Sequence, residues 1–231
     1  MDGTNVSQDE KTSGFERILT LEKKINILVH GNSEGFNSDF MQYLNTHLKA
    51  HEKDCYGFDF DYIVKQKEPS LGQRKELNQL LGIIKNFKQQ GYKEINLIGK
   101  SLGGVICLNE EIAKDPNIKN IFLLGFPLIL GFPPDLSRLK AKPIIPNPNA
   151  VEEYVKVFNQ IGNNIDKIKI IQGTNDLSCP AELLSMLLNK CKESAQIFFV
   201  ENASHSFKPI TEDTTLDANL DKIINIIDLN S

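Results

Sequence analysis

INLIGKSLGGVIC, residues 95–107, contains the pattern G-x-S-x-G at the point where an apolar strand is expected to end and a helix to begin. In that context the pattern is typical of a nucleophile elbow, a sharp strand-to-helix turn that exposes a serine. Glycines are needed there because the serine adopts a strained backbone conformation and the neighbouring chain packs where a Cβ would clash. The sequence therefore predicts that Ser101 projects from the carboxyl edge of a sheet.

A phosphate-binding loop is the competing interpretation of the same letters. Gly99-Lys100-Ser101 resembles the end of G-x-x-x-x-G-K-[ST], which also lies between a strand and a helix. The first glycine of that pattern would fall on Glu94, and an apolar strand stands where the loop should wrap the phosphates. The nucleotide-binding interpretation is therefore disfavoured.

Outward from the elbow, short apolar runs alternate with segments of helical periodicity. The runs are Ile25–His30, Tyr56–Val64, Ile95–Ile98, Ile121–Leu124, Ile168–Ile171 and Ile197–Val200. Stripes with helical spacing span Phe40–Leu48, Leu77–Phe87, Val151–Phe158, Leu183–Cys191 and Leu216–Ile227. Strands that alternate with helices predict an α/β fold, a three-layer αβα sandwich around a mostly parallel sheet of six to eight strands.

The length of 231 residues suits one domain, which we place at 15–231, after a polar N-terminal tail at 1–14. The segment 126–150 holds six of the ten prolines. Prolines disrupt helix interiors and central strands, so we expect an ordered excursion over the sheet edge rather than a regular element.

Composition excludes several classes of function. With 26 basic and 30 acidic residues the net charge is −4, which offers no basic field for nucleic acid. The longest apolar stretch, Ile121–Phe132, is too short to span a bilayer, and the polar N-terminus lacks a signal sequence, so a cytoplasmic protein is expected. Four scattered cysteines without a C-x-x-C pair are expected to be reduced thiols, and no metal or other cofactor is expected.

A serine nucleophile needs a base, and the base needs an acid to orient it. Of the four histidines only His205 follows Ser101, and it lies in a loop just after a predicted strand. Asp176 also follows a predicted strand, whereas Asp166 precedes the same strand and belongs to the opposite sheet edge. Asp176 is therefore the predicted acid, with Asp135 in the proline-rich segment as a distant second choice.

Negative charge on a reacting carbonyl oxygen needs backbone donors. The N–H of Leu102, directly after the serine, is the first candidate, and the N–H of Asn32 is the second, with Gly31 close behind. His30 is expected to order this loop through its ring nitrogens rather than to take part in catalysis. Lys100 is expected to point to solvent, as lysines usually do.

Four segments in matching order resemble the α/β-hydrolases over residues 18–229: HGNSEGF, GKSLGG, GTNDLSCP and ENASHSF. The chain looks most similar to small, lidless members related to dienelactone hydrolase, some of which have a Gly-aromatic-Pro-Leu run like Gly125–Leu128. The resemblance implies an eight-stranded sheet, and Phe15–Leu21 is a candidate for a further edge strand. Dienelactone hydrolases proper use a cysteine nucleophile, so the serine here means that their substrate is not carried over.

These features predict a serine hydrolase that cleaves a small carboxylic ester or thioester through an acyl-enzyme on Ser101. The apolar residues Phe126, Leu128 and Ile129 are expected either to line an acyl pocket or to be a core strand end and a buried turn. The alternative from another class is an inactive binding or scaffolding protein with this fold. Oligomeric state and substrate identity are left open.

Overall fold

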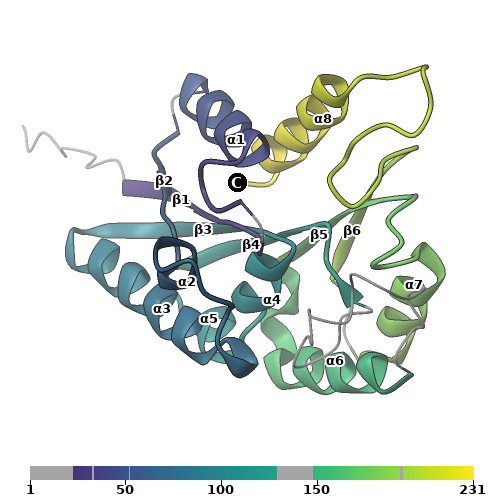
Figure 1. Ribbon diagram of the computed structural model, residues 1–231. Coiled ribbons are helices and arrows are strands. Elements are labelled where there is room, and N and C mark those ends of the chain that lie inside the picture. The colour runs from purple at the N-terminus through teal and green to yellow at the C-terminus, as the bar shows by residue number, and fades with distance from the viewer. Residues whose placement is uncertain (1–22, 33, 52, 129–147, 193–194) are drawn as a thin grey trace, which may run out of the picture.

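A six-stranded parallel sheet forms the centre of the protein (Figure 1). The computed structural model describes residues 23–32, 34–51, 53–128, 148–192 and 195–231. The strands are β1 (Lys23–Val29), β2 (Cys55–Gly57), β3 (Tyr92–Lys100), β4 (Ile118–Leu124), β5 (Ile168–Gly173) and β6 (Gln196–Val200). Their order in the sheet is β2-β1-β3-β4-β5-β6, and every neighbouring pair is parallel.

Helices cover both faces of this sheet, as Figure 1 shows. One face carries α1 (Asp39–Ala50) and α8 (Leu216–Leu229), and the other carries α3 (Arg74–Gln89), α4 (Leu102–Cys107), α5 (Glu110–Lys114), α6 (Pro148–Ile161) and α7 (Ala181–Lys190). Successive strand residues enter different cores: Leu97 packs on the α3 side and Ile98 on the α1 side. Strands buried on both faces explain the continuous apolar runs. The predicted three-layer αβα sandwich is confirmed.

The sheet order places a crevice at the carboxyl ends of β1 and β3. From β1 the chain crosses outward to β2 and then returns to the other side of β1 as β3. The loops that follow β1 and β3 therefore leave in opposite directions, and open α/β sheets bind ligands at such a switch point. The sequence after Val29 and the sequence after Lys100 meet at this position.

One predicted strand is largely wrong. Within Tyr56–Val64 only the first two residues belong to β2, and the last four form the short helix α2 (Asp61–Val64). The aromatic residues between them are apolar for another reason, since Phe58 and Phe60 pack around the buried ring of His30. Phe60 also donates its N–H to His30 Nε2 at 3.0 Å. This bond holds residues 58–60 in a segment that is not paired in the sheet.

The proline-rich segment ends in a helix, contrary to the expectation for 126–150. Helix α6 begins at Pro148, the first helical position, where the missing N–H of proline costs nothing. Residues 129–147 lie outside the described part of the chain, and so do the tail at 1–14, the candidate strand Phe15–Leu21 and the second-choice acid Asp135.

A line of buried polar side chains crosses the sheet near the amino ends of its strands, on the α1 side. Lys169 Nζ donates to Asn120 Oδ1 (2.7 Å), Asn120 Nδ2 to Asn96 Oδ1 (2.9 Å) and Asn96 Nδ2 to Asn26 Oδ1 (3.1 Å). Asn26 Nδ2 donates in turn to the carbonyl of Asp54, just before β2 (3.4 Å). This asparagine ladder satisfies polar groups that would otherwise be buried without partners.

The four cysteines are free thiols, with Cys107 and Cys179 buried and Cys55 and Cys191 partly exposed. In the described part of the chain, no helix combines the length and the apolar character that crossing a membrane requires.

Candidate active site

Ser101 lies between β3 and α4 in a conformation that few non-glycine residues adopt, with φ 52° and ψ −116°. Its N–H donates to the carbonyl of Leu124 at the end of β4 (2.9 Å), and its carbonyl accepts the N–H groups of Gly104 and Val105. These bonds hold the strained residue between the sheet and the helix. The strand-to-helix turn predicted around this serine is therefore present.

Two glycines of the elbow stand where side chains would not fit. A Cβ at Gly103 would lie 2.2 Å from the carbonyl oxygen of Val29, and a Cβ at Gly99 would lie 2.7 Å from the carbonyl carbon of Gly103. The first contact brings α4 against the end of β1, and the second lets the chain fold back on β3. Glycine at these positions thus brings the elbow close to the loop that follows β1.

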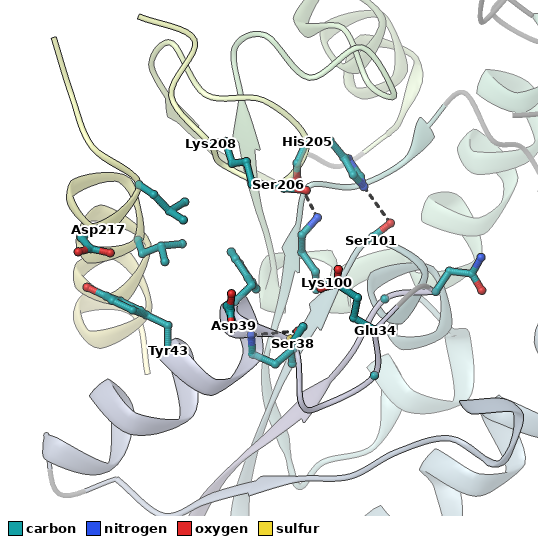
Figure 2. A pocket seen from close by; sticks show the side chains of 17 residues that line it. Glu34, Ser38, Asp39, Tyr43, Lys100, Ser101, His205, Ser206, Lys208 and Asp217 are labelled. Carbon is teal, nitrogen blue, oxygen red and sulfur yellow. Dashed lines mark hydrogen bonds between the residues drawn. The ribbon is translucent and has the colours of Figure 1, made fainter. Parts of the chain in front are cut away.

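His205 links the predicted serine and the predicted acid. Its Nε2 lies 2.9 Å from Ser101 Oγ, and its Nδ1 lies 2.8 Å from Asp176 Oδ2. Figure 2 shows the ring of His205 directed at the hydroxyl of Ser101. Because a carboxylate only accepts, the proton belongs on Nδ1 and leaves Nε2 free to accept the serine proton. The three residues, predicted from chain order, come together at the carboxyl edge of the sheet.

Asp176 is held by more donors than His205 alone. Ser178 donates its N–H (2.8 Å) and its hydroxyl (2.6 Å) to Asp176 Oδ1, and Gln172 Nε2 donates to Oδ2 (2.6 Å). Burial by itself raises the pKa of this carboxyl group, but the hydrogen bonds from His205 and Ser178 outweigh burial and leave the pKa below its ordinary value. The acid therefore stays ionised near neutral pH.

Gln172 and Ser178 were not among the predicted site residues. Ser178 Oγ also lies 2.8 Å from His205 Nδ1, so it touches both the base and the acid. Gln172 is a completely buried polar residue on β5, and its Oε1 accepts the N–H of Phe126 at 2.9 Å. A polar residue within an apolar strand, four positions before the predicted acid, was the available signal for it.

Lys100 does not point to solvent, contrary to expectation. Its side chain is on the same face of β3 as that of Ile98 and lies beneath α1 and α8, with only 8% of the residue exposed. Its Nζ donates to the backbone carbonyl of His205 at 2.8 Å. Burial lowers the pKa of Lys100 to about 8, against a smaller opposing effect of Asp176.

His30 orders the loop after β1, as expected. Its Nε2 accepts the N–H of Phe60, so the ring proton lies on Nδ1, which donates to the carbonyl of Gly31 at 2.6 Å. The hydroxyl of Tyr62 donates to the same carbonyl at 2.9 Å. Burial lowers the pKa of His30, in keeping with a neutral ring. This histidine fixes the loop and takes no part in the contacts to Ser101.

The candidate donors for a carbonyl oxygen flank the serine. Leu102 is the first residue of α4, where an N–H has no partner inside the helix. Gly31 packs on the elbow, since a Cβ there would lie 3.3 Å from both Lys100 O and Ser101 Cβ. Asn32 lines the cavity that Ser101 also lines. The assignment of Leu102 and Asn32, with Gly31 as the near alternative, stays a prediction.

A cavity of about 540 Å³ opens beside Ser101 and His205. Its walls come from the loop after β1, the loop after β6 and the first turns of α1 and α8 (Figure 2). The lining side chains include Phe40, Lys208, Leu216 and Leu220. The acidic side chains Glu34, Asp39 and Asp217 also line it.

Phe126 and Leu128 are not on the wall of this cavity. Both are completely buried, and the ring of Phe126 packs edge-on against Tyr154 of α6. Gly125, at φ 56°, turns the chain inward after β4, and Gln172 Oε1 accepts the hydrogen bond of the Phe126 N–H. Of the two alternatives for these residues, the buried turn holds, and Ile129 lies outside the described residues.

Comparison with known proteins supplies a family match and a set of similar folds. The sequence model described as "Alpha/beta hydrolase domain" matches residues 22–153, more than half of the chain. A search of the curated proteins finds no match.

Three similar solved structures illustrate the likeness of the fold. A serine hydrolase without a lid from Xanthomonas campestris is 13% identical, with 93% of this chain and 84% of that chain covered and a TM-score of 0.62. Est1E from Butyrivibrio proteoclasticus with ferulic acid bound is 15% identical, with 90% of each chain covered and a TM-score of 0.59. A dienelactone hydrolase from Anabaena variabilis is 16% identical, with 90% of this chain and 87% of that chain covered and a TM-score of 0.59. At these identities the likeness concerns the fold.

Proposed function

Because the chain belongs to the α/β-hydrolase family, we propose that it is a serine hydrolase that cleaves a carboxylic ester or thioester through an acyl-enzyme on Ser101. The observation that carries the proposal is the unbroken hydrogen-bonded chain from Ser101 Oγ through the ring of His205 to Asp176. A serine hydroxyl becomes a useful nucleophile only when such a base takes its proton.

The reaction would proceed in two halves. In the first, Ser101 Oγ attacks the carbonyl carbon while His205 Nε2 accepts the hydroxyl proton, and His205 then gives that proton to the departing alcohol or thiol. In the second, His205 takes a proton from water, the hydroxide attacks the acyl-enzyme, and Ser101 recovers its proton as the acid product leaves. Asp176 keeps its negative charge throughout and stabilises the imidazolium.

Backbone donors would stabilise the negative oxygen of each tetrahedral intermediate. We assign the N–H groups of Leu102 and Asn32 to this role, with Gly31 as the alternative to Asn32. The tight packing of the β1 loop on the elbow supports the assignment, because it brings both segments to the same side of Ser101. Loss of one such donor lowers turnover by about 100- to 1,000-fold in known enzymes.

The cavity supports a small acyl substrate. Phe40, Leu216 and Leu220 give it an apolar wall between α1 and α8, and apolar walls with a few polar groups are typical of small-molecule sites. This wall replaces the buried Phe126 and Leu128 as the proposed contact for the acyl group. Ferulic acid is bound in one of the similar structures, Est1E, which is consistent with an aromatic acid of modest size.

A fluorophosphonate probe tests the proposal directly. We expect the native protein to be labelled at Ser101, as located by peptide mass spectrometry, and Ser101→Ala to remain unlabelled. Ser185→Ala is the matched control, because Ser185 is an exposed serine whose hydroxyl bonds only within α7. Absence of labelling at Ser101 in the native protein, together with no hydrolysis across a panel of esters and thioesters, would favour the inactive binding or scaffolding alternative.

A further inference from the structure

Lys100 is a buried cation next to the proposed nucleophile. Within the described part of the chain its Nζ makes one hydrogen bond, to the backbone carbonyl of His205 (2.8 Å), and it lies 5.7 Å from the ring centres of Phe40 and Phe207. Among the described residues no carboxylate forms an ion pair with it. The dashed line from Lys100 in Figure 2 marks the hydrogen bond, which ends on the loop that carries His205.

An ammonium group in this position is expensive for the fold. Burial of a charge without an ionic partner is unfavourable, and two aromatic rings recover only part of the lost hydration. Lys100 nevertheless stays mostly charged at pH 7, since its pKa is about 8. A methionine of similar length would fill the same space without this penalty. Packing alone therefore does not account for a lysine here.

Gly125 provides the room for the contact. A Cβ at this position would lie 2.9 Å from Lys100 Nζ, 2.8 Å from the carbonyl oxygen of His205 and 3.5 Å from His205 Nδ1. The lysine amine, the His205 backbone and the His205 ring thus converge on one glycine at the end of β4. Any side chain at residue 125 would enter the space between the lysine and the histidine.

The loop of His205 is also bonded to other segments on either side of that carbonyl: Ala203 O accepts the N–H of Asn175 (3.0 Å), and Phe207 O accepts Nδ2 of Asn219 from α8 (3.0 Å). It carries two residues with positive φ, Asn202 (54°) and Phe207 (59°), and it is closed by the bonds Phe207 N–H to Ser204 O and Ser204 N–H to Lys208 O. Those bonds shape the turn itself. The bonds from Asn175 and Asn219 tie the loop to the segment after β5 and to α8, whereas the bond from Lys100 ties the backbone of His205 itself to β3, the strand that ends next to Ser101.

We propose that Lys100 is a positioning residue that holds the backbone of His205 so that its ring reaches the hydroxyl of Ser101. Two adjacent residues then form hydrogen bonds with the same histidine: Ser101 with the ring and Lys100 with the backbone carbonyl. Movement of the β6 loop relative to the elbow would break both contacts together. The inference rests on the proposed function, because positioning matters only if His205 is the base.

Lys100→Met is the decisive variant, and Lys169→Met is its matched control. Lys169 is equally buried, bonds to Asn120 and lies 5.9 Å from the ring of Phe122, but it stands near the amino end of β5, away from the site. For Lys100→Met we expect kcat to fall by up to about 100-fold while KM changes little, since a displacement of about 1 Å in a catalytic group has effects of this size. For Lys169→Met we expect kcat of the folded protein to be unchanged.

Stability separates positioning from a merely structural role. Removal of a buried unpaired charge should leave the urea midpoint of Lys100→Met equal to or above that of the native protein, so a lower kcat cannot be ascribed to unfolding. Lys100→Ala is a second variant, and added propylammonium should restore part of its kcat in a concentration-dependent manner. Native-like kcat in both variants would overturn the proposal.

A measurement independent of turnover keeps the two proposals distinct. The imidazole ¹⁵N–¹H signal of His205, assigned by its loss in His205→Gln, should shift in Lys100→Met and stay in place in Lys169→Met. If the native protein shows no hydrolysis that depends on Ser101, the proposed function fails, and this signal alone then decides the contact. An unchanged His205 signal in Lys100→Met would overturn the positioning role even in an active enzyme.

Discussion

Replacement of Gly103 by alanine should disrupt the active site, while the same replacement at Gly104 should be tolerated. The added methyl group at residue 103 would lie 2.2 Å from the carbonyl oxygen of Val29 and 2.6 Å from that of His30. At residue 104 the nearest atoms are Gly99 O at 3.1 Å and Leu123 Cδ2 at 3.7 Å. The two glycines are neighbours in the same helix, so each variant controls for the other.

The size of the effect follows from these distances. An ordinary carbon–oxygen contact is about 3.3 Å, so α4 must move away from β1 by about 1 Å in Gly103→Ala. We expect a loss of about 3 kcal/mol in the free energy of unfolding, the upper end of the range for overpacking, because backbone atoms cannot rotate away. The same movement separates Ser101 from the loop of Asn32 and should lower kcat by about 100-fold. Gly104→Ala should stay within about 1 kcal/mol of the native protein.

Urea denaturation followed by circular dichroism gives the two free energies, and the rate of fluorophosphonate labelling reports the active site in the folded protein. The reasoning requires both quantities to separate the variants. A Gly103→Ala protein that unfolds at the native urea concentration and is labelled at the native rate would show that the approach of α4 to β1 is not the constraint described above.

Four further outcomes follow from three residues. Gly82 is exposed in α3 with no atom within 4 Å of an added Cβ, so Gly82→Ala should raise the free energy of unfolding by about 0.5–1 kcal/mol, and a lower urea midpoint would contradict this. Asp176→Asn should lower kcat by about 10,000-fold with the fold intact. The pKa of Asp176 in the folded protein is below the ordinary value of 3.8. The ionised carboxylate therefore stabilises the fold above pH 3.8, and this stabilisation is lost as the pH falls through the pKa of the folded protein. The difference in free energy of unfolding between the native protein and Asp176→Asn should accordingly close in acid. The pKa of Lys100 falls from 10.5 to about 8 on folding, so between these pH values the unfolded chain binds more protons than the folded protein. The free energy of unfolding of the native protein, relative to that of Lys100→Met, should therefore rise by up to about 3 kcal/mol from pH 8 to pH 10.5. Urea titrations that show a difference independent of pH would refute this.

The elbow and the three linked side chains were predictable because local pattern and chain order constrain them. G-x-S-x-G between a strand and a helix fixes where Ser101 can be, and only one histidine follows it. Parallel strands bring their carboxyl ends to one edge, so residues after β5 and β6 had to meet the residue after β3. The same logic gave the α/β sandwich, since short apolar runs alternate along the chain with segments of helical periodicity.

Contacts between distant segments explain what could not be predicted. Lys100 is buried because Phe40 and Phe207, which come from other parts of the chain, pack beside it. Phe126 turns into the core because Gln172 on the next strand takes its N–H, a bond that no local pattern reveals. Phe58 and Phe60 imitate strand residues in sequence although their partner is a histidine ring. For the phenylalanines, hydrophobicity signalled burial correctly but did not specify the partner, whereas for Lys100 the polar character of the residue gave the wrong prediction.

The asparagine ladder has a consequence for how the sheet assembles. Strands that are apolar on both faces can change register with little loss of buried hydrophobic area. Apolar side chains alone would therefore define the register poorly. The hydrogen bonds of the row all run in one direction: each side chain donates to the next, from Lys169 to the carbonyl of Asp54. A shift of one residue in the register of a strand would leave several of these buried donors and acceptors without hydrogen-bond partners. The ladder therefore favours the native register of the strands at their amino ends, because only that register pairs every amide in the row.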